Sequence, residues 1–168
     1  MVEFAAIDFE TTGYENGATN EPWQLGVALV RDGVIVCTDE FFFKTSQLPA
    51  SSTSTSYFDS LLNSSTSQLS ILDQWSSWYP LLEGRRLVAH NIATERTILT
   101  RLAPLTKWGP WVDTLKLAKA RYPKLPSYAL GDLCEMFGIV PQMEGRTWHD
   151  GLYDAVACAN LANFLNAI

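Results

Sequence analysis

Two apolar segments separated only by Asp32 and Gly33 constrain this chain more than any other feature. Residues 24–31 and 34–43 both have the composition of buried strands. A two-residue hairpin turn needs positive φ angles, which glycine adopts freely, so this Asp-Gly pair predicts an antiparallel hairpin. A third apolar segment, residues 2–8, precedes the hairpin and is soon broken by a Thr-Thr-Gly sequence. The first third of the chain is therefore expected to form a three-stranded antiparallel meander.

The rest of the chain alternates between strand and helix patterns. Apolar residues at helical spacing span residues 70–83, and a strand pattern follows at 86–90. Asp113 is expected to cap a helix that begins at the next residue. Strands that are followed by alternating strands and helices predict an α/β fold with a mixed sheet flanked by helices. The further helices, each bounded by Pro, Gly or a polar residue, are expected at 94–102, 114–121, 128–137 and 150–166.

Length and composition favour a single domain over residues 1–168. A chain of 168 residues, 47% of them apolar, can bury one core and is short for two. Ser and Thr dominate residues 45–70, which predicts a long surface connection with a short helix near 57–62. The three cysteines are widely spaced, which favours reduced thiols over a disulfide framework or a cysteine-based zinc site.

Neither a membrane segment nor a secretion signal is evident. Every apolar run is far shorter than the roughly 20 residues that a membrane-spanning helix requires. The N-terminus leads directly into a strand pattern, without the basic flank, apolar stretch and cleavage site of a signal peptide. We therefore expect a soluble, cytoplasmic protein that does not contact membranes.

The net charge of −6 is unevenly distributed along the chain. Residues 1–84 have a balance of −9, whereas residues 85–168 have a balance of +3. A negative protein is a poor partner for a polyanion by simple electrostatics. Two divalent cations held by acids from both halves would add four positive charges, so a nucleic-acid substrate is not excluded.

Asp8 and Glu10 lie at the end of the first predicted strand. Residues two apart in a strand point to the same face, so both carboxylates are expected on one side of the sheet. Two like charges repel each other and resist burial, and a bound cation would remove both penalties. Oxygen ligands without cysteine or clustered histidine favour Mg²⁺ or Mn²⁺ over zinc. The alternative is a solvent-facing acidic pair, since Asp-x-Glu alone is weak evidence.

Three segments in order resemble the motifs of one family. Residues 8–13 (DFETTG), 87–95 (LVAHNIATE) and 149–155 (HDGLYDA) resemble the three exonuclease motifs of the DEDDh-type, DnaQ-like exonucleases, which include proofreading-subunit-like domains. Residues 112–115 and 128–133 are similar to the family's connecting segments. The resemblance implies a ribonuclease H-like fold, in which three antiparallel strands are followed by parallel ones.

The same resemblance implies an activity. The implied activity is that of a 3′→5′ exonuclease. Such an enzyme uses two Mg²⁺ or Mn²⁺ ions to hydrolyse phosphodiester bonds at the 3′ end of single-stranded nucleic acid, and it releases 5′-mononucleotides. DNA proofreading or repair is the leading expectation. The alternatives are an RNA 3′-end-trimming exoribonuclease and a catalytically weakened nucleic-acid-binding module. A DNA polymerase is a candidate partner, expected to bind the domain surface because no tail follows the last predicted helix, and a free-standing nuclease is equally compatible.

Residue roles are carried over onto matching positions. Asp8, Glu10 and Asp154 would hold one metal, and Asp8 would bridge to the second. Glu95 would bind that second metal, directly or through water. It stands where the family usually has Asp, and it could instead be an acid favoured by the helix dipole. His149 would be the general base.

Substrate contacts are less firmly implied. The backbone N–H groups of the Thr-Thr-Gly turn could reach the terminal nucleotide. The aromatic residue between the two acids could stack on a base or belong to the core. The His-Asn pair at the end of the strand predicted at 86–90 could be structural. A basic cluster at residues 116–124 could follow a phosphate backbone or simply be solvated. The expected substrate-binding residues are Phe9, Thr11, Thr12, Gly13, His90 and Asn91.

Overall fold

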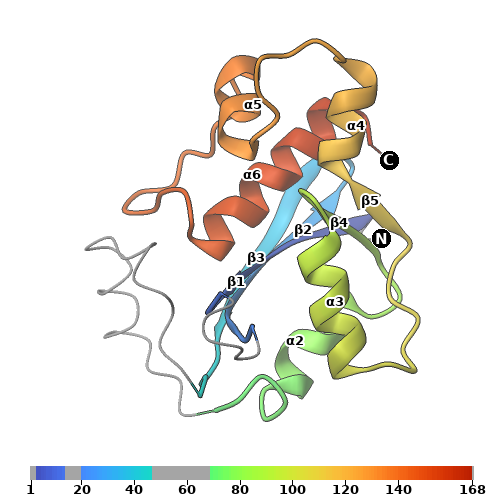
Figure 1. Ribbon diagram of the computed structural model, residues 1–168, viewed down its shortest axis with the longest axis vertical. Helices are drawn as coiled ribbons and strands as arrows, with labels where there is room; N and C mark the ends of the chain where they lie inside the picture. The colour runs from blue at the N-terminus through green and yellow to red at the C-terminus, as the bar shows by residue number, and fades with distance from the viewer. Residues whose placement is uncertain (1–2, 14–19, 47–68, 168) are drawn as a thin grey trace.

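The computed structural model describes residues 3–13, 20–46 and 69–167, which form a five-stranded mixed sheet with helices on both faces (Figure 1). The strand order is β3-β2-β1-β4-β5. The first three strands pair antiparallel, and β4 and β5 continue the sheet parallel to β1. The expected mixed α/β sheet is thus confirmed. The strands are β1 (Phe4–Thr11), β2 (Pro22–Arg31), β3 (Val34–Phe42), β4 (Arg86–Ala89) and β5 (Trp111–Asp113).

The hairpin between β2 and β3 turns where the sequence predicts it. Asp32 and Gly33 have φ angles of 51° and 71°, both in the left-handed region. A turn with two such residues matches the right-handed twist of the flanking strands, which is why the Asp-Gly sequence forms it. Arg31 pairs with Val34 directly across the turn.

Alternation along β1 assigns its side chains to two cores on opposite faces of the sheet. Ile7 belongs to the cluster that α2 and α3 cover, with Trp78 and Leu99. Ala6 belongs to the cluster that α6 covers, with Val156 and further residues of that helix. α4 and α5 pack against α6 through a third cluster. The helices are α2 (Trp75–Leu82), α3 (Ala93–Leu102), α4 (Thr114–Arg121), α5 (Leu130–Phe137) and α6 (Gly151–Phe164).

The first turn of α6 rests directly on the sheet. A methyl group built at Gly26 in β2 would lie 2.0 Å from the carbonyl oxygen of Gly151, so only glycine fits there. A methyl group at Gly151 would lie 3.3 Å from the carbonyl oxygen of Asp8. This close approach brings the start of α6 to the part of β1 that carries the acidic pair.

Some boundaries differ from the expectation. β5 was not predicted, because three residues are too short for a periodic pattern. Asp113, its last residue, does cap α4 as expected, accepting from the backbone N–H of Leu115 at 3.1 Å. α2 begins at Trp75 rather than near 70, because Ser70 and Asp73 bond to each other in a preceding turn.

The short helix near 57–62 and most of the Ser/Thr-rich connection lie outside the described residues. Within the ranges that are described, none of the helices combines the length and apolar character needed to cross a bilayer.

Candidate active site

Asp8 and Glu10 extend from the same face of β1, as alternation requires. Phe9 between them is 5% exposed and belongs to the cluster under α2 and α3. The two acids therefore face the side that α6 covers. They lie beside Gly26 and Gln24 of β2, their partners in the strand register.

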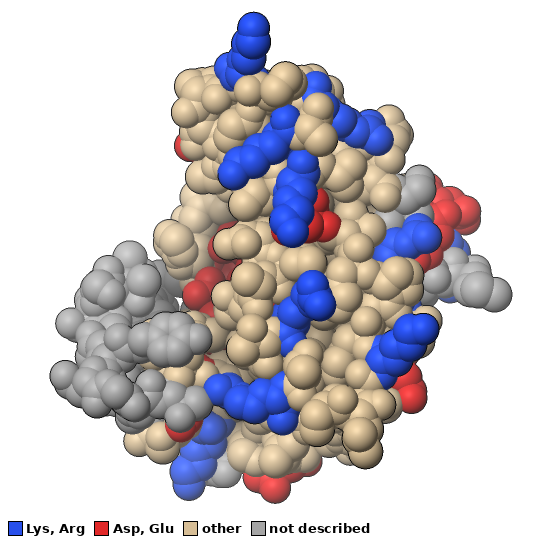
Figure 2. All heavy atoms as spheres, turned by 45° about the vertical axis from the view of Figure 1, so that its right-hand side comes forward, with Lys and Arg blue, Asp and Glu red and all other residues tan. Residues whose placement is uncertain are grey.

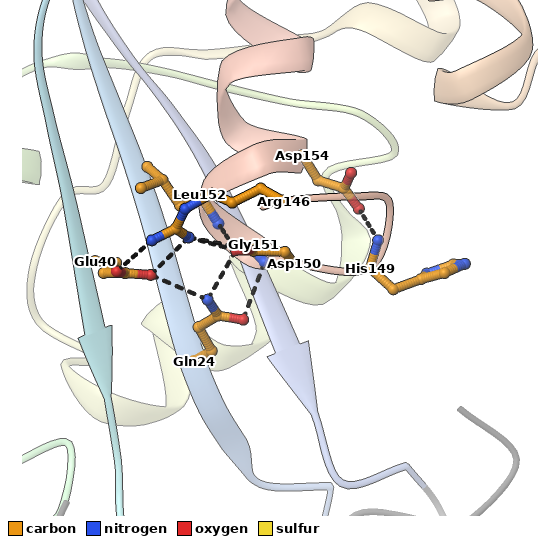
Figure 3. A network of polar contacts seen from close by, with 8 residues as sticks. All are labelled: Gln24, Glu40, Arg146, His149, Asp150, Gly151, Leu152 and Asp154. Atoms are coloured by element: carbon orange, nitrogen blue, oxygen red, sulfur yellow. Dashed lines mark hydrogen bonds and ion pairs between the residues drawn. The ribbon is translucent and has the colours of Figure 1, made fainter. Parts of the chain in front are cut away.

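The start of α6 supplies two more functional groups. Asp150 is the N-cap, and Asp154 lies one turn into the helix. His149 immediately precedes the cap and has a φ of 69°, in the left-handed region. Its backbone N–H donates to Asp154 Oδ2 at 3.2 Å, and its ring is exposed and points away from the helix (Figure 3). Potential ligand atoms of Glu10, His149 and Asp154 lie within 4.8 Å of one another.

Glu95 reaches the same region from the first turn of α3. Its side chain is 4% exposed, and its Oε2 has no hydrogen-bond partner among the described residues. The Oδ1 atom of Asp154 is also buried and without a partner in that part of the chain. A buried carboxylate oxygen without a donor is costly, and a bound cation would satisfy it. The donor set therefore fits divalent cations that prefer oxygen ligands.

Electrostatics tie the four acids into one cluster. Burial raises the pKa of Asp8 well above its usual range, and the charges of Glu10, Asp154 and Glu95 add to the shift. Burial likewise raises the pKa of Glu10, of Glu95 and of Asp154 to about 7. The charge of Glu10 raises the pKa of Asp154 further. A nearby cation would reverse these shifts by favouring the ionised forms.

The predicted substrate contacts at the end of β4 are engaged in the fold. His90 Nδ1 lies 2.9 Å from Thr114 Oγ1, and its Nε2 lies 2.8 Å from the carbonyl oxygen of Tyr128. These bonds agree with the structural interpretation of His90. Asn91 has a left-handed φ of 68°, and its backbone N–H donates to Asp113 Oδ1 at 3.2 Å. Its side chain is exposed on the way into α3.

The Thr-Thr-Gly turn also bonds within the protein. The Thr12 backbone N–H donates to the carbonyl oxygen of Glu21 at 2.8 Å, and the Gly13 N–H donates to Asn20 Oδ1 at 2.9 Å. Thr11 ends β1. Nucleotide contacts of Thr12 and Gly13 through their N–H groups would replace these bonds, and Phe9 lies in the core rather than on a surface.

Sequence reasoning missed a polar network at the start of α6, which Figure 3 shows. Gln24 and Asp150 are both 0% exposed and bond to each other at 3.0 Å. Arg146 bridges Asp150 to Glu40 in β3. The one signal in the sequence is Gln24, a polar residue in an otherwise apolar strand.

A hollow of about 610 Å³ lies between α3 and the start of α4. Asn91, Arg96, Arg101, Asp113 and Lys116 are among the residues that line it. Arg96, the residue that follows Glu95 in α3, lies in its wall. Lys and Arg side chains gather over the face that carries these helices (Figure 2). The wall of this hollow is thus suited to a negatively charged ligand.

The sequence of this chain is similar to those of known exonucleases and polymerases. The model of the exonuclease family RNase_T matches residues 5–162. The PolC-type DNA polymerase III of Halalkalibacterium halodurans is 29% identical over 168 residues, covering 95% of this chain and 11% of that protein. The 3′-5′ exonuclease DinG of Staphylococcus saprophyticus is 29% identical over 143 residues, covering 82% of this chain and 15% of that protein. The chain thus spans only 11% to 15% of the length of these relatives.

Solved structures share the fold. Exonuclease X in complex with 5′ overhanging duplex DNA superposes with a TM-score of 0.70 at 19% identity, covering 98% of this chain and 91% of that one. The nuclease domain of 3′hExo, a DEDDh family member bound to rAMP, gives a TM-score of 0.67 at 19% identity, covering 99% and 92%. The expected ribonuclease H-like fold is therefore confirmed. Because the family model matches nearly the whole chain, this protein belongs to the exonuclease family as a DEDDh-type, DnaQ-like exonuclease domain.

Proposed function

We propose that the protein is a metal-dependent 3′→5′ exonuclease that removes 5′-mononucleotides one at a time from the 3′ end of single-stranded DNA. The observation that carries this proposal is the convergence of Glu10, His149 and Asp154 within 4.8 Å, together with the buried oxygens Asp154 Oδ1 and Glu95 Oε2, which lack protein donors in the described chain. Such an arrangement is expensive to maintain for structure alone.

The acids would hold two Mg²⁺ or Mn²⁺ ions. Asp8, Glu10 and Asp154 would bind one of them, and Glu95 would bind the second with Asp8 as the bridge. Two divalent cations can stabilise both the attacking and the departing oxygen of an in-line displacement. The longer side chain of Glu95 starts from the first turn of α3 and still turns inward, which supports its role as a ligand.

His149 would act as the general base. Its imidazole is exposed, so it can take a proton from an attacking water and pass that proton to solvent. Its backbone is fixed to Asp154, so the base and a metal ligand are held in one local unit.

The hollow between α3 and the start of α4 supports a nucleic-acid substrate. Arg96 and Lys116 line that hollow, and in this proposal they contact the phosphates that precede the terminal phosphodiester. DNA is proposed because the relatives include DNA polymerases of the PolC type. Those relatives also support association with a polymerase. RNA is the competing substrate, since a solved structure with the same fold holds rAMP.

The test is digestion of matched DNA and RNA oligonucleotides, with free or blocked 3′ ends, in Mg²⁺, Mn²⁺ or chelator. We expect stepwise shortening of DNA from a free 3′ end, only with metal, and none with Asp8→Ala or Asp154→Ala. Cleavage that persists with chelator or in Asp8→Ala would contradict the proposal. Faster digestion of RNA than of DNA would instead show that RNA is the preferred substrate of the same metal-dependent hydrolysis.

A further inference from the structure

The polar network ties the loop before α6 to two strands of the sheet (Figure 3). Arg146 Nη1 donates to Asp150 Oδ1 and Oδ2 at 3.0 and 2.8 Å. The same guanidinium donates to Glu40 Oε2 and Oε1 in β3, at 2.8 and 2.5 Å. Gln24 in β2 donates to Asp150 Oδ1 at 3.0 Å and accepts from the backbone N–H of Gly151 at 3.0 Å. One guanidinium and one amide thus fix the end of the loop.

Asp150 is the buried centre of this network. Its side chain is 0% exposed, and its Oδ1 also accepts from the backbone N–H of Leu152 as the helix cap. A buried carboxylate is tolerated when a cation and enough donors surround it, and removing the cation leaves an uncompensated charge. Arg146, with 22% of its side chain exposed, supplies that cation.

His149 lies inside the loop that the network holds. Its φ of 69° is sparsely populated by residues other than glycine, so the surroundings must maintain it. Asp150, which directly follows His149, is held by Gln24 and Arg146. Arg146 itself lies three positions before His149. Trp148 adds a contact, with its ring edge-on to Tyr153 at 4.9 Å between centroids. The loop therefore has few alternative positions while the network is intact.

We propose that Arg146, braced by Glu40, is a positioning residue that keeps His149 beside Glu10 and Asp154. Arg146 contacts Asp150 and Glu40, and in this proposal it acts on His149 through Asp150 rather than on the reacting atoms. The inference rests on the proposed function for the role of His149, whereas the geometry that it concerns does not depend on any substrate.

Arginine is specifically suited to this position. Its planar fork can engage two carboxylates at once, whereas a lysine ammonium is a point charge on a flexible stem. Arg146→Lys should therefore still neutralise the charge of the buried Asp150 carboxylate, while it weakens the ion pair with Glu40. Arg146→Met keeps the length of the side chain and removes both functions.

The experiment compares Arg146→Met, Arg146→Lys and Glu40→Gln with the wild-type chain. Leu165→Ala serves as the matched control, because Leu165 is buried in the third cluster with α4 and α5. It should lower the melting temperature without touching the loop. The readouts are kcat and KM on a 3′-terminal substrate, and the imidazole NMR resonances. The chain has only two histidines, and His90, bonded to Thr114 and Tyr128, is an internal reference.

We expect Arg146→Met to lower kcat by roughly 10- to 100-fold with KM within about threefold, since misplacing a catalytic group mainly affects turnover. The His149 resonance should shift or broaden while that of His90 stays in place. Arg146→Lys should recover part of kcat, and Glu40→Gln should fall between wild type and Arg146→Met. Leu165→Ala should keep the wild-type kcat and His149 resonance at temperatures where it is folded.

An unchanged His149 resonance in Arg146→Met and Glu40→Gln would overturn the inference, and so would an equal loss of kcat in Leu165→Ala. If Arg146→Met does not fold, Glu40→Gln and Arg146→Lys decide by the same two readouts. A wild-type chain without activity, whose His149 resonance still responds to Arg146→Lys and Glu40→Gln, would reject the proposed function and retain the positioning role.

Discussion

Gly26 of β2 and Gly151 of α6 are in backbone contact, close enough that a single methyl group at Gly26 would fall 2.0 Å from the Gly151 carbonyl oxygen. This contact sets the distance between the last helix and the sheet. It also sets the distance between the acids of β1 and Asp154, because Asp154 lies one turn beyond Gly151. The geometry of the acidic cluster thus depends on two residues that carry no functional group.

Gly26→Ala should be strongly destabilising, because the added methyl group meets backbone that cannot rotate away. We expect the free energy of unfolding to fall by about 3 kcal/mol or more. Gly151→Ala should cost about 1 kcal/mol, since its nearest contact would be 3.3 Å. Urea unfolding of both variants measures the difference, and equal midpoints would show that the close contact does not exist in solution.

Asp8→Asn should stabilise the metal-free protein and remove its activity. The variant relieves repulsion among buried carboxylates, so its melting temperature in chelator should exceed that of wild type at pH 8. Without the proposed bridging ligand, exonuclease activity should fall by about 100-fold or more. Calorimetry with and without Mn²⁺ checks both effects, and a lower melting temperature in chelator would contradict the repulsive cluster.

The stability of the metal-free protein should fall as pH rises from 6 to 8. Glu10, Glu95 and Asp154 have pKa values of about 7 in the folded protein, above the ordinary values of 4.5, 4.5 and 3.8. The folded state therefore holds protons that the unfolded state has released, and it loses that advantage as pH rises through about 7. Burial lowers the pKa of His90 below its ordinary 6.5, so its titration is displaced away from pH 7.

The measurement is urea unfolding at several pH values in chelator and in excess Mg²⁺. Saturating metal should flatten the profile, because the bound ions favour the ionised carboxylates. A metal-free profile that rises over this interval would mean that the acids are not buried together.

Charge reversal in the hollow should affect long substrates more than small ones. Arg96→Glu combined with Lys116→Glu should raise KM for a 20-nucleotide strand by about tenfold at low salt and reduce the salt dependence of binding. Hydrolysis of a p-nitrophenyl ester of thymidine 5′-monophosphate, which has no preceding phosphates, should change little. Arg31→Glu is the matched control, because Arg31 lies at the hairpin turn, away from Gln24 at the other end of β2. Equal effects on both substrates would show that the nucleic-acid strand does not bind along the hollow.

The sequence predicted those parts of the fold that local chemistry determines. The hairpin follows from Asp32 and Gly33, and the shared face of Asp8 and Glu10 follows from alternation. Strand β5 is too short to show a period. The polar network joins Gln24 to Asp150 across 126 positions and recruits Glu40 from a third segment, so no local pattern announces it. The hydrogen bonds of Thr12 and Gly13 to Glu21 and Asn20 likewise depend on tertiary structure, because they require the segment before β2 to lie beside the end of β1.

Asn91 and His149, which precede the helices of Glu95 and Asp154, share mirror-handed backbone torsions that favour glycine. Replacement by Gly should therefore be tolerated at both positions. Replacement by Val or Ile should be destabilising, because β-branched residues do not adopt a positive φ readily. At position 149 a Gly substitution therefore separates the role of the backbone conformation from the role of the imidazole. A His149→Gly protein would retain the entrance to the last helix while it lacks the imidazole, and imidazole added to the buffer could then stand in for the missing ring.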